Sequence, residues 1–271
     1  MPLAICATPI GNLEDVTLRV LDELREAEIV LCEDTRHTAG LLERHGIAAA
    51  GRLRSYHQHN EAARVAELLP ALEAGARVAL VSDAGLPGIN DPGTRLVEAA
   101  LERTIPVTVL PGPSAVETAL AASGLAGEQY RFVGYLPRRE AEREALWAEL
   151  AAWPHPVVAF ESPRRLPAVL ASLAAALPAR EIAICRELTK RFEEIVRGSA
   201  LEVAARFDSP PKGEVTIVMG GAALPEARVP DSVAISAVAE LVADGLPRRR
   251  AAALVSRLTG IPKNTLYKTG L

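Results

Sequence analysis

The segment LVSDAGLPGINDPG, residues 80–93, ends an apolar run and then places three glycines, two prolines, two aspartates and an asparagine on one loop. An ordinary connection between a strand and a helix needs only about two to six residues. Polar loops on a rigid scaffold are frequent binding sites, and in parallel sheets ligands bind beyond the carboxyl ends of the strands. We therefore interpret residues 80–93 as a ligand-binding loop, with an ordinary strand–helix turn as the alternative.

The region around this loop, residues 1–124, alternates strand-sized apolar runs with segments whose apolar residues have helical spacing. Strands are predicted over residues 3–7, 28–32, 77–82 and 106–110, and helices over residues 17–26, 60–73, 94–103 and 114–123. Near-continuous apolar strands separated by helices are typical of a parallel sheet covered on both faces. The predicted class of this region is therefore α/β.

A second α/β region is predicted over residues 125–222. Its strands are expected over residues 157–160, 181–185, 193–196 and 214–219, and its helices over residues 165–175 and 200–207, with a further amphipathic stretch from Pro137 through Trp147. Because more of these strands follow one another directly, we expect a mixed sheet. The segment GGAALPEARVP, residues 220–230, has the composition of a linker.

The last 41 residues, 231–271, form a different kind of module. Asp231 is placed to cap a helix that ends at Gly245, Pro247 begins another that stops at Gly260, and a third short helix follows Pro262. Residues 245–271 contain no acidic residue, although the whole chain has a net charge of −4. Their basic residues are Arg248, Arg249, Arg250, Arg257, Lys263 and Lys268. We predict a helix-turn-helix-like module that binds RNA; a basic face turned to solvent is the alternative.

Composition excludes several classes of protein. The 271 residues are 49% hydrophobic, which is ample for buried cores, and no apolar run is long enough to span a membrane. Aromatic residues make up 4%, so stacked aromatic platforms are not the expected way of binding RNA. No signal peptide is visible, and Cys6, Cys32 and Cys185 each lie in an apolar run, as expected for free thiols in the cytoplasm.

Two further turns follow predicted strands of the first region. ATPIGN, residues 7–12, stands where a phosphate-binding loop would carry several glycines, yet it has only Gly11 and lacks a backbone donor at Pro9. VLPGPSA, residues 109–115, is stiffened by prolines, and Ser114 is placed to cap the next helix. Together with residues 80–93 this second turn is expected to form two walls of one pocket.

Charged and histidine-containing segments also follow predicted strands. LCEDTRHT contributes Glu33, Asp34, Arg36 and His37, and YHQHN contributes His57 and His59. No compact spacing of metal ligands occurs, so we predict no metal site and assign the two histidines of YHQHN to the surface or to substrate contact. In the second region, FESPRR and CRELTKRFEEI are either a solvated rim or the wall of a cleft.

The chain resembles a known family in several long motifs that occur in the same order. These are ATPIGNLEDVTLR, EDTRHT, SDAGLPGINDPG, PGPSA, FESPRR, RELTK, KGE and the tail LPRRRAAALVSRLTGIPKNTLYK. They resemble the bacterial ribosomal RNA small-subunit methyltransferase I family, S-adenosylmethionine-dependent (cytidine-2'-O)-methyltransferases of the tetrapyrrole-methylase superfamily. The first turn departs from the glycine-rich pattern of the wider superfamily but matches this branch. S-adenosylmethionine has no phosphate, so a first turn without a phosphate cradle suits it.

The resemblance implies two α/β domains with the cofactor cleft between them, a homodimer, and a cytidine in the decoding centre of 16S rRNA as the target. It places the cofactor, which leaves as S-adenosylhomocysteine, against Pro9, Asp83, Ala84, Gly85, Pro87, Ser114, Ala115, Phe160, Leu188, Glu214 and Val215. Candidates for RNA handling or proton transfer are Arg36, His37, Glu187 and Lys190, and the base stays unassigned. No metal is required for this reaction.

Two alternative functions stay open at this point. One is a methylase of the same fold that acts on a tetrapyrrole or a protein, and the other is an RNA-binding adaptor without activity. The basic tail speaks against the first, and the intact 80–93 segment speaks against the second. The predicted domains are residues 1–124, 125–222 and 231–271, in a cytoplasmic protein that acts on rRNA or on the small ribosomal subunit.

Overall fold

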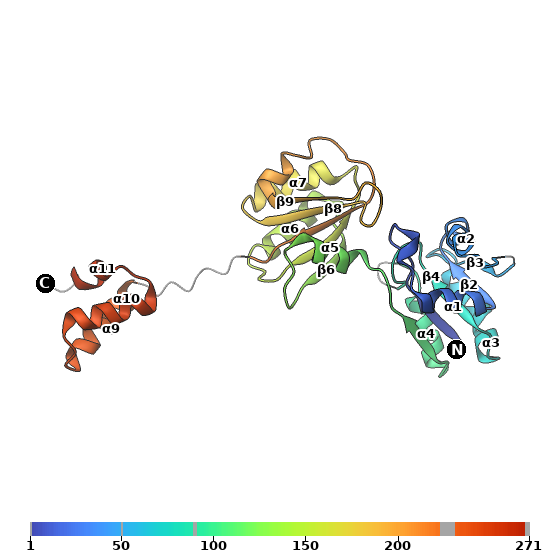
Figure 1. The fold of residues 1–271 in the computed structure, drawn as a ribbon, viewed down its shortest axis with the longest axis horizontal. Helices are drawn as coiled ribbons and strands as arrows, with labels where there is room; N and C mark the ends of the chain where they lie inside the picture. Colours follow the sequence, from blue (N-terminus) through green and yellow to red (C-terminus); the bar gives the residue numbers. More distant parts are fainter. Residues whose placement is uncertain (1, 50, 89–90, 223–230, 269–271) are drawn as a thin grey trace. The chain divides into compact units, whose positions relative to one another are not determined.

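The computed structural model describes residues 2–49, 51–88, 91–222 and 231–268, and the chain forms two compact units, Met1–Ala222 and Ala223–Leu271. The first unit contains two five-stranded sheets with helices against them, and the second contains helices α9, α10 and α11 (Figure 1). Among the described residues, none of the helices has the length and apolar character needed to cross a lipid bilayer.

The first sheet is parallel throughout, as predicted. Its strand order is β3 (Leu53–Ser55), β2 (Ile29–Cys32), β4 (Val78–Val81), β1 (Leu3–Cys6) and β5 (Val107–Leu110). The helices that follow these strands are α1 (Leu18–Glu26), α2 (Thr35–Arg44), α3 (Glu61–Glu73) and α4 (Thr94–Glu102). Residues of α1 and α2 share one buried cluster, and residues of α3 and α4 share another. Alternate residues of β1 belong to the two clusters, so both faces of the sheet are covered.

Strands β1 and β4 are neighbours in this sheet, but the helices that follow them lie on opposite faces. Their carboxyl-terminal loops therefore diverge and leave a crevice, which is where ligands bind in open parallel sheets. The two loops are joined at their start, because Thr8 and Gly85 exchange backbone hydrogen bonds of 2.8 and 3.0 Å. The order of the strands thus places residues 80–93 beside the first turn.

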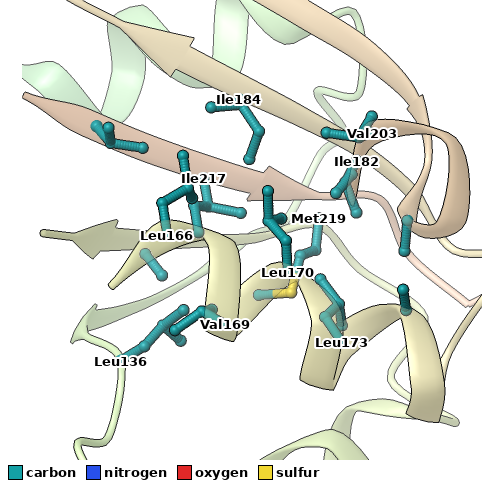
Figure 2. Packing of buried hydrophobic residues seen from close by; sticks show 14 of the residues in the cluster. Leu136, Leu166, Val169, Leu170, Leu173, Ile182, Ile184, Val203, Ile217 and Met219 are labelled. Carbon is teal, nitrogen blue, oxygen red and sulfur yellow. The ribbon is translucent and has the colours of Figure 1, made fainter. Parts of the chain in front are cut away.

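The second sheet is mixed, again as predicted. Its strand order is β6 (Arg131–Tyr135), β7 (Val157–Glu161), β10 (Val215–Met219), β8 (Glu181–Arg186) and β9 (Glu194–Ser199). Only the β6–β7 pair of this sheet is parallel. Helices α6 (Glu140–Leu150), α7 (Leu166–Ala176) and α8 (Ala200–Ala204) belong to this half. Figure 2 shows one face of this sheet, where Leu166, Leu170 and Leu173 of α7 pack against strand residues such as Ile184 and Ile217.

The other face of the second sheet is covered by α5 (Ala115–Ser123), the helix that follows β5 of the first sheet. Val116 and Leu120 of α5 pack with Val158 and Val218 in a buried cluster that also contains Ile10 from the first turn. The first turn and helix α5 therefore share a core with the second sheet, which helps to fix the position of the loops around them.

The second unit is a small helical bundle with its own core. It comprises α9 (Asp231–Ala243), α10 (Arg248–Thr259) and α11 (Lys263–Lys268), as the sequence predicts. Val238, Val255 and Leu266 bring the three helices into one buried cluster. Helix α10 ends at Gly260 with a φ of 71°, a left-handed conformation that glycine adopts without strain. Most of the predicted linker, residues 220–230, lies outside the described residues.

One strand of the first sheet, β3, and one helix next to it, α2, are absent from the predictions. Helix α2 begins with the polar turn TRHT, and its buried leucines, Leu41 and Leu42, come only in its second half, so the helical spacing is short. Strand β3 has three residues and contains an arginine, which leaves no apolar alternation to detect. Both elements owe their existence to packing in the sheet more than to local pattern.

Candidate active site

The loop that begins the 80–93 segment is fixed by hydrogen bonds to the first turn. The buried Thr8 hydroxyl donates to the Ser82 carbonyl at 2.9 Å, and the Ser82 hydroxyl donates to the Gly85 carbonyl at 3.0 Å. Gly85 has a φ of 86°, a conformation that side chains strain, so a glycine is needed at this turn. The backbone from Ser82 to Gly85 is therefore held in place without a ligand.

A cavity of about 490 Å³ lies between these loops and the second sheet. Its lining contains many of the residues predicted to contact the cofactor: Asp83, Ala84, Gly85, Ser114, Ala115, Phe160, Leu188, Glu214 and Val215. Successive side chains of a strand point to opposite faces of the sheet. Phe160 of β7 and Cys185 of β8 point to the face covered by α5, where the cavity lies, and not to the core on the other face. The structure thus brings the loops after β4 and β5 together with β7 and β10.

The remaining lining residues are ones that sequence reasoning did not name as site residues: Ile10, Leu86, Asp91, Val116, Tyr135, Glu161, Ser162, Pro163, Cys185 and Thr216. Some carried a signal, since Asp91 belongs to the 80–93 segment and Glu161 to the FESPRR motif. Tyr135 carried none, because β6 was not recognised as a strand.

Other predicted residues lie outside the cavity lining. Pro9 and Pro87 are buried in the loops, and Arg36 and His37 are exposed on the first turn of α2. Glu187 and Lys190 lie on the connection between β8 and β9. Their predicted roles in RNA handling or proton transfer stay predictions.

Ser114 occupies the position before α5, but its hydroxyl does not accept a hydrogen bond from the helix backbone. It donates instead to the carboxylate of Glu117, which also accepts from the Tyr130 hydroxyl at 2.6 Å. The predicted side-chain cap is therefore wrong. Since Ala115 and Val116 line the cavity, the first turn of α5, whose N–H groups have no partner within the helix, forms part of its wall.

Three carboxylates, Glu33, Asp83 and Asp91, form what we call the acidic wall. Burial, together with the nearby charges of Glu33 and Asp83, raises the pKa of Asp91 to about 6. Burial and the charge of Asp83 also raise the pKa of Glu33, against an opposing effect of His57. Asp83 accepts a 3.0 Å hydrogen bond from the backbone N–H of Asp34. The crowding of like charges favours a cationic ligand beside this wall.

The opposite side of the cavity has an aromatic surface and one further buried carboxylate. The ring of Phe160 has edge contacts with Phe132 and Tyr135, at centroid distances of 5.0 and 5.7 Å. Glu161 has a side chain with no exposed area; it accepts a 2.6 Å hydrogen bond from the Ser162 N–H and lies 3.0 Å from Arg165. Burial raises the pKa of Glu161.

A second charged group, Glu187, Lys190 and Glu214, is here called the paired rim. Lys190 Nζ lies 3.0 Å from Glu187 and 2.9 Å from Glu214, and Glu187 also accepts from the Glu214 N–H at 2.9 Å. The hydrogen bond from the Glu214 backbone, followed by the Lys190 ammonium, lowers the pKa of Glu187. Desolvation would lower the pKa of Lys190, but the two carboxylates outweigh it and raise that pKa.

The single glycine of the first turn is explained by the loop that carries the paired rim. A Cβ atom on Gly11 would lie 2.5 Å from Lys190 Cγ and 2.7 Å from the Leu188 carbonyl oxygen. Next to it, the Asn12 N–H donates to the Thr189 hydroxyl at 3.0 Å. Glu187 and Thr189 have φ values of 52° and 63°, so the loop is also strained. Gly11 thus permits close approach of another part of the chain.

The cysteines of the first unit are not activated as nucleophiles. Burial raises the pKa of the Cys6 thiol to about 12 and that of Cys185 to about 11, so neither supplies a thiolate at neutral pH. All three cysteines are buried and free. Within the described residues, no group of three or more histidine, cysteine or acidic side chains is placed to hold a metal ion.

The second unit carries the basic residues predicted to contact RNA. Arg249, Arg250 and Arg257 are exposed on α10, and Arg248 and Lys263 are partly exposed. Lys268 ends α11, and its side chain lies outside the described residues. Because no acidic residue follows Asp244, the exposed surface of α10 and α11 is free of negative side chains.

Similarity to known proteins extends over nearly the whole chain. Residues 2–204 match the family of tetrapyrrole (corrin/porphyrin) methylases, and residues 229–271 match the RsmI C-terminal HTH domain. The chain is 44% identical over 270 residues to ribosomal RNA small subunit methyltransferase I of Micromonospora olivasterospora, covering 98% of this chain and 85% of that protein. It is 42% identical over 269 residues to the protein of the same name from Mesorhizobium japonicum, covering 98% and 90%.

Solved structures share the fold at low identity. Uroporphyrin-III-C-methyltransferase from Thermus thermophilus matches with a TM-score of 0.57 and 22% identity, over 80% of this chain and 93% of that one. The enzyme from the same organism complexed with S-adenosylhomocysteine matches with a TM-score of 0.55 and 20% identity, over 80% and 96%. The Aeropyrum pernix protein APE0931 matches over 98% of this chain and 95% of that one, with a TM-score of 0.63 and 18% identity.

Proposed function

The chain belongs to the tetrapyrrole methylase family, in the branch of the ribosomal RNA small subunit methyltransferases I, and we propose that it methylates the 2'-hydroxyl of a cytidine in the decoding centre of 16S rRNA. It is an S-adenosylmethionine-dependent methyltransferase. The observation that carries the proposal is the combination, in one chain, of a cavity framed by strand-end loops and a basic module that matches the RsmI C-terminal HTH domain.

The cavity fits S-adenosylmethionine in size and in chemistry. Its volume of about 490 Å³ lies in the range of sites for ligands of this size. The cofactor carries a sulfonium and an ammonium group, and the cavity is lined by the carboxylates of Asp83, Asp91 and Glu161. Ile10, Phe160 and Leu188 offer an apolar surface for the adenosine.

In the proposed reaction the protein acts mainly by positioning. When bound, S-adenosylmethionine supplies a methyl group on a sulfonium, which is a good leaving group. We expect Asp83 of the acidic wall to hold the cationic end, and the apolar residues near Phe160 to exclude water from the adenosine. The paired rim holds the loop that carries Leu188, and with it one side of the cavity.

The basic module is proposed to supply RNA affinity. Arginine and lysine neutralise phosphates and release counterions, so binding should weaken steeply as salt rises. The cavity-lining residues all lie in the first unit, so we expect removal of residues 231–271 to leave cofactor binding intact.

Several finer features belong to the proposal as well. We propose the domain boundaries 1–124, 125–222 and 231–271, a homodimer, a cytoplasmic location, and a substrate presented by the small ribosomal subunit. The six basic residues of the tail and the predicted cofactor contacts keep their proposed roles.

The experiment that tests this function is transfer of radiolabelled methyl groups from S-adenosylmethionine to small subunits isolated from a strain lacking the corresponding gene. We expect label in 16S rRNA at one cytidine, located by nuclease digestion and mass spectrometry as a 2'-O-methyl nucleotide. Uroporphyrinogen serves as the competing substrate. Label on uroporphyrinogen and none on RNA would assign the chain to tetrapyrrole methylation, and absence of cofactor binding in calorimetry would favour the RNA-binding adaptor.

A further inference from the structure

We propose that Asp91 is the catalytic base, the group that takes the proton of the attacking ribose hydroxyl. This assignment rests on the proposed function. It follows from the position of Asp91 in the cavity lining and from the partners of every other carboxylate there.

The position of Asp91 is fixed by an anchor two residues away. The backbone N–H of Gly93 donates to Glu61 Oε1 at 3.1 Å, and the Tyr56 hydroxyl donates to the same oxygen at 2.8 Å. Glu61 is buried at the start of α3, and Arg95 lies 3.7 Å from its second oxygen. The end of the 80–93 segment is therefore tied to the body of the first sheet, and Asp91 stands at the cavity as part of a held loop.

The other carboxylates in the lining are engaged. Asp83 accepts from the Asp34 N–H, and Glu214 is paired with Lys190. Glu161 accepts from the Ser162 N–H through Oε1, while Oε2 has no hydrogen bond to a described residue but forms an ion pair with Arg165 at 3.0 Å, and the side chain has no exposed area. Asp91 makes no hydrogen bond or ion pair with any residue in the part of the chain that the structure describes. A carboxylate whose oxygens have no partner among the described residues is suited to receive a proton.

The previously named candidates are less suited to proton transfer. Arg36 and His37 lie on α2 and do not line the cavity. Glu187 and Lys190, on the connection between β8 and β9, do not line it either. Glu187 and Lys190 are also held in ion pairs that stabilise the charge of each. Lys190 is protonated at neutral pH in this arrangement and cannot accept a proton.

The surroundings of Asp91 tune it as a base. Glu33 and Asp83 act on it from the first sheet, and its own charge, with those of Glu214 and Glu161, acts on the Tyr135 hydroxyl of β6. The pKa of about 6 leaves Asp91 ionised at neutral pH, while making it a stronger base than an ordinary aspartate. A cation bound nearby would lower this pKa and so keep the carboxylate ionised.

The proposed step couples methyl transfer to loss of the hydroxyl proton. The ribose oxygen forms a bond to the methyl carbon while the bond from that carbon to sulfur breaks, and the electron pair stays on sulfur. Asp91 takes the hydroxyl proton as the oxygen–carbon bond forms. The products are the 2'-O-methyl ribose, S-adenosylhomocysteine and a protonated Asp91, which then releases its proton to solvent.

The test compares Asp91→Asn with the wild type in methylation of small subunits, in calorimetry with S-adenosylmethionine, and in thermal melting. Loss of a general base costs about 100- to 10,000-fold in rate. We expect Asp91→Asn to lose kcat by that order, with cofactor affinity changed less than about fivefold and a melting temperature no lower than that of the wild type. Retained kcat, or loss of cofactor binding in proportion to the loss of rate, would overturn the assignment.

The control is Glu33→Gln, which removes a neighbouring charge without touching the cavity lining. Wild-type kcat/KM for RNA should fall in acid with a midpoint at or below pH 6, and Glu33→Gln should move that midpoint to lower pH. Carboxyl NMR of Asp91 in the cofactor-free protein should show the same shift. An unmoved midpoint would refute the role of Asp91, whereas a wild type that labels no RNA would refute the proposed function and the assignment with it.

Discussion

The acidic wall and the paired rim contain the same kinds of side chain but are built in opposite ways. In the rim, Lys190 lies between two carboxylates, and the pKa of Glu187 is lowered. In the wall, no lysine or arginine is paired with Glu33, Asp83 or Asp91 among the described residues, and the pKa values of Glu33 and Asp91 are raised. The fold thus stabilises the charged states of Glu187 and Lys190 and destabilises those of Glu33 and Asp91.

This difference distinguishes charged residues that stabilise the fold from charged residues that are available to bind a ligand. A paired charge gains its stabilisation within the protein and has little left to offer a substrate. Unpaired carboxylates in a cavity cost stability, which folding must offset elsewhere, and strongly shifted groups are often found at functional sites. Substitution of Asp83 should therefore affect cofactor binding and substitution of Asp91 should affect the rate, whereas substitutions in or beneath the rim should affect stability.

The largest effect outside the assigned base is expected at Asp83. Asp83→Ala should weaken S-adenosylmethionine binding about 10- to 100-fold, because a charged hydrogen-bond partner is worth about 1.5–3 kcal/mol. Calorimetry measures the affinity, and circular dichroism checks that the fold is retained. Asp22→Ala, which removes an exposed carboxylate paired with Arg25, is the control and should leave the affinity unchanged. Equal cofactor affinities for the two variants would mean that Asp83 contributes no more to binding than an exposed carboxylate on the surface.

The next largest effect, a loss of stability, is expected at Gly11, where the loop that carries the paired rim contacts the first turn. Gly11→Ala introduces a Cβ 2.5 Å from Lys190 Cγ and 2.7 Å from a backbone oxygen, so the loop must move. We expect a loss of about 1–3 kcal/mol in the free energy of unfolding, as for other overpacked sites. Urea denaturation followed by circular dichroism measures it.

Gly40→Ala is the matched control for that variant. Gly40 lies in α2, and nothing lies within 4 Å of the Cβ that it would gain. Alanine in a helix is more stable than glycine by up to about 1 kcal/mol, so this variant should be neutral or stabilised. If Gly11→Ala behaves like Gly40→Ala, the contact between the first turn and the loop is not what Gly11 provides.

Much of the fold could be predicted from the sequence, because strand-sized apolar runs and helical spacing are strong where both faces of a sheet are covered. The parallel first sheet, the mixed second sheet and the three tail helices follow from such patterns. Strand β3 and helix α2 could not be predicted, since β3 is three residues long and the apolar residues of α2 come late. Tertiary packing decides these elements.

The site could be predicted only in part. The turns at residues 80–93 and 109–115 carry their own signal in glycine and proline, and both line the cavity. The contacts of the second sheet depended on the family resemblance, since alternation shows which strand residues share a face but not which face meets the loops. The sequence could not show which charged residues are paired and which are not, because Lys190 and Glu214 are 24 residues apart and pair only after folding.

A smaller effect is expected at Glu187. Its pKa is lowered in the folded protein by the hydrogen bond from the Glu214 N–H and then by Lys190, so these contacts stabilise the fold above the ordinary pKa and the stabilisation is lost as pH falls through the lowered value. Glu187→Gln should reduce the free energy of unfolding at pH 7 by about 1–2 kcal/mol, a value typical of a charged hydrogen bond. Denaturation at pH 7 and at pH 3 measures this, and the difference from wild type should shrink at the lower pH. A constant difference would mean that charge pairing is not the cause.

The smallest effect has the opposite sign and belongs to Asp91. Its pKa is raised from 3.8 to about 6, so the ionised carboxylate destabilises the folded protein above pH 6, and the penalty disappears as pH falls from 6 toward 4. Because the group is partly solvated, we expect Asp91→Asn to raise the free energy of unfolding at pH 7.5 by only about 1 kcal/mol. Denaturant titrations of the cofactor-free protein at pH 7.5 and pH 4 measure the change, which should vanish at pH 4. Paired with Glu187→Gln, the experiment gives two acid-to-amide substitutions of opposite sign at neutral pH. If both substitutions lower the free energy of unfolding at neutral pH, the ionised carboxylate of Asp91 stabilises the folded protein as that of Glu187 does. The proposed electrostatic difference between the wall and the rim would then be wrong.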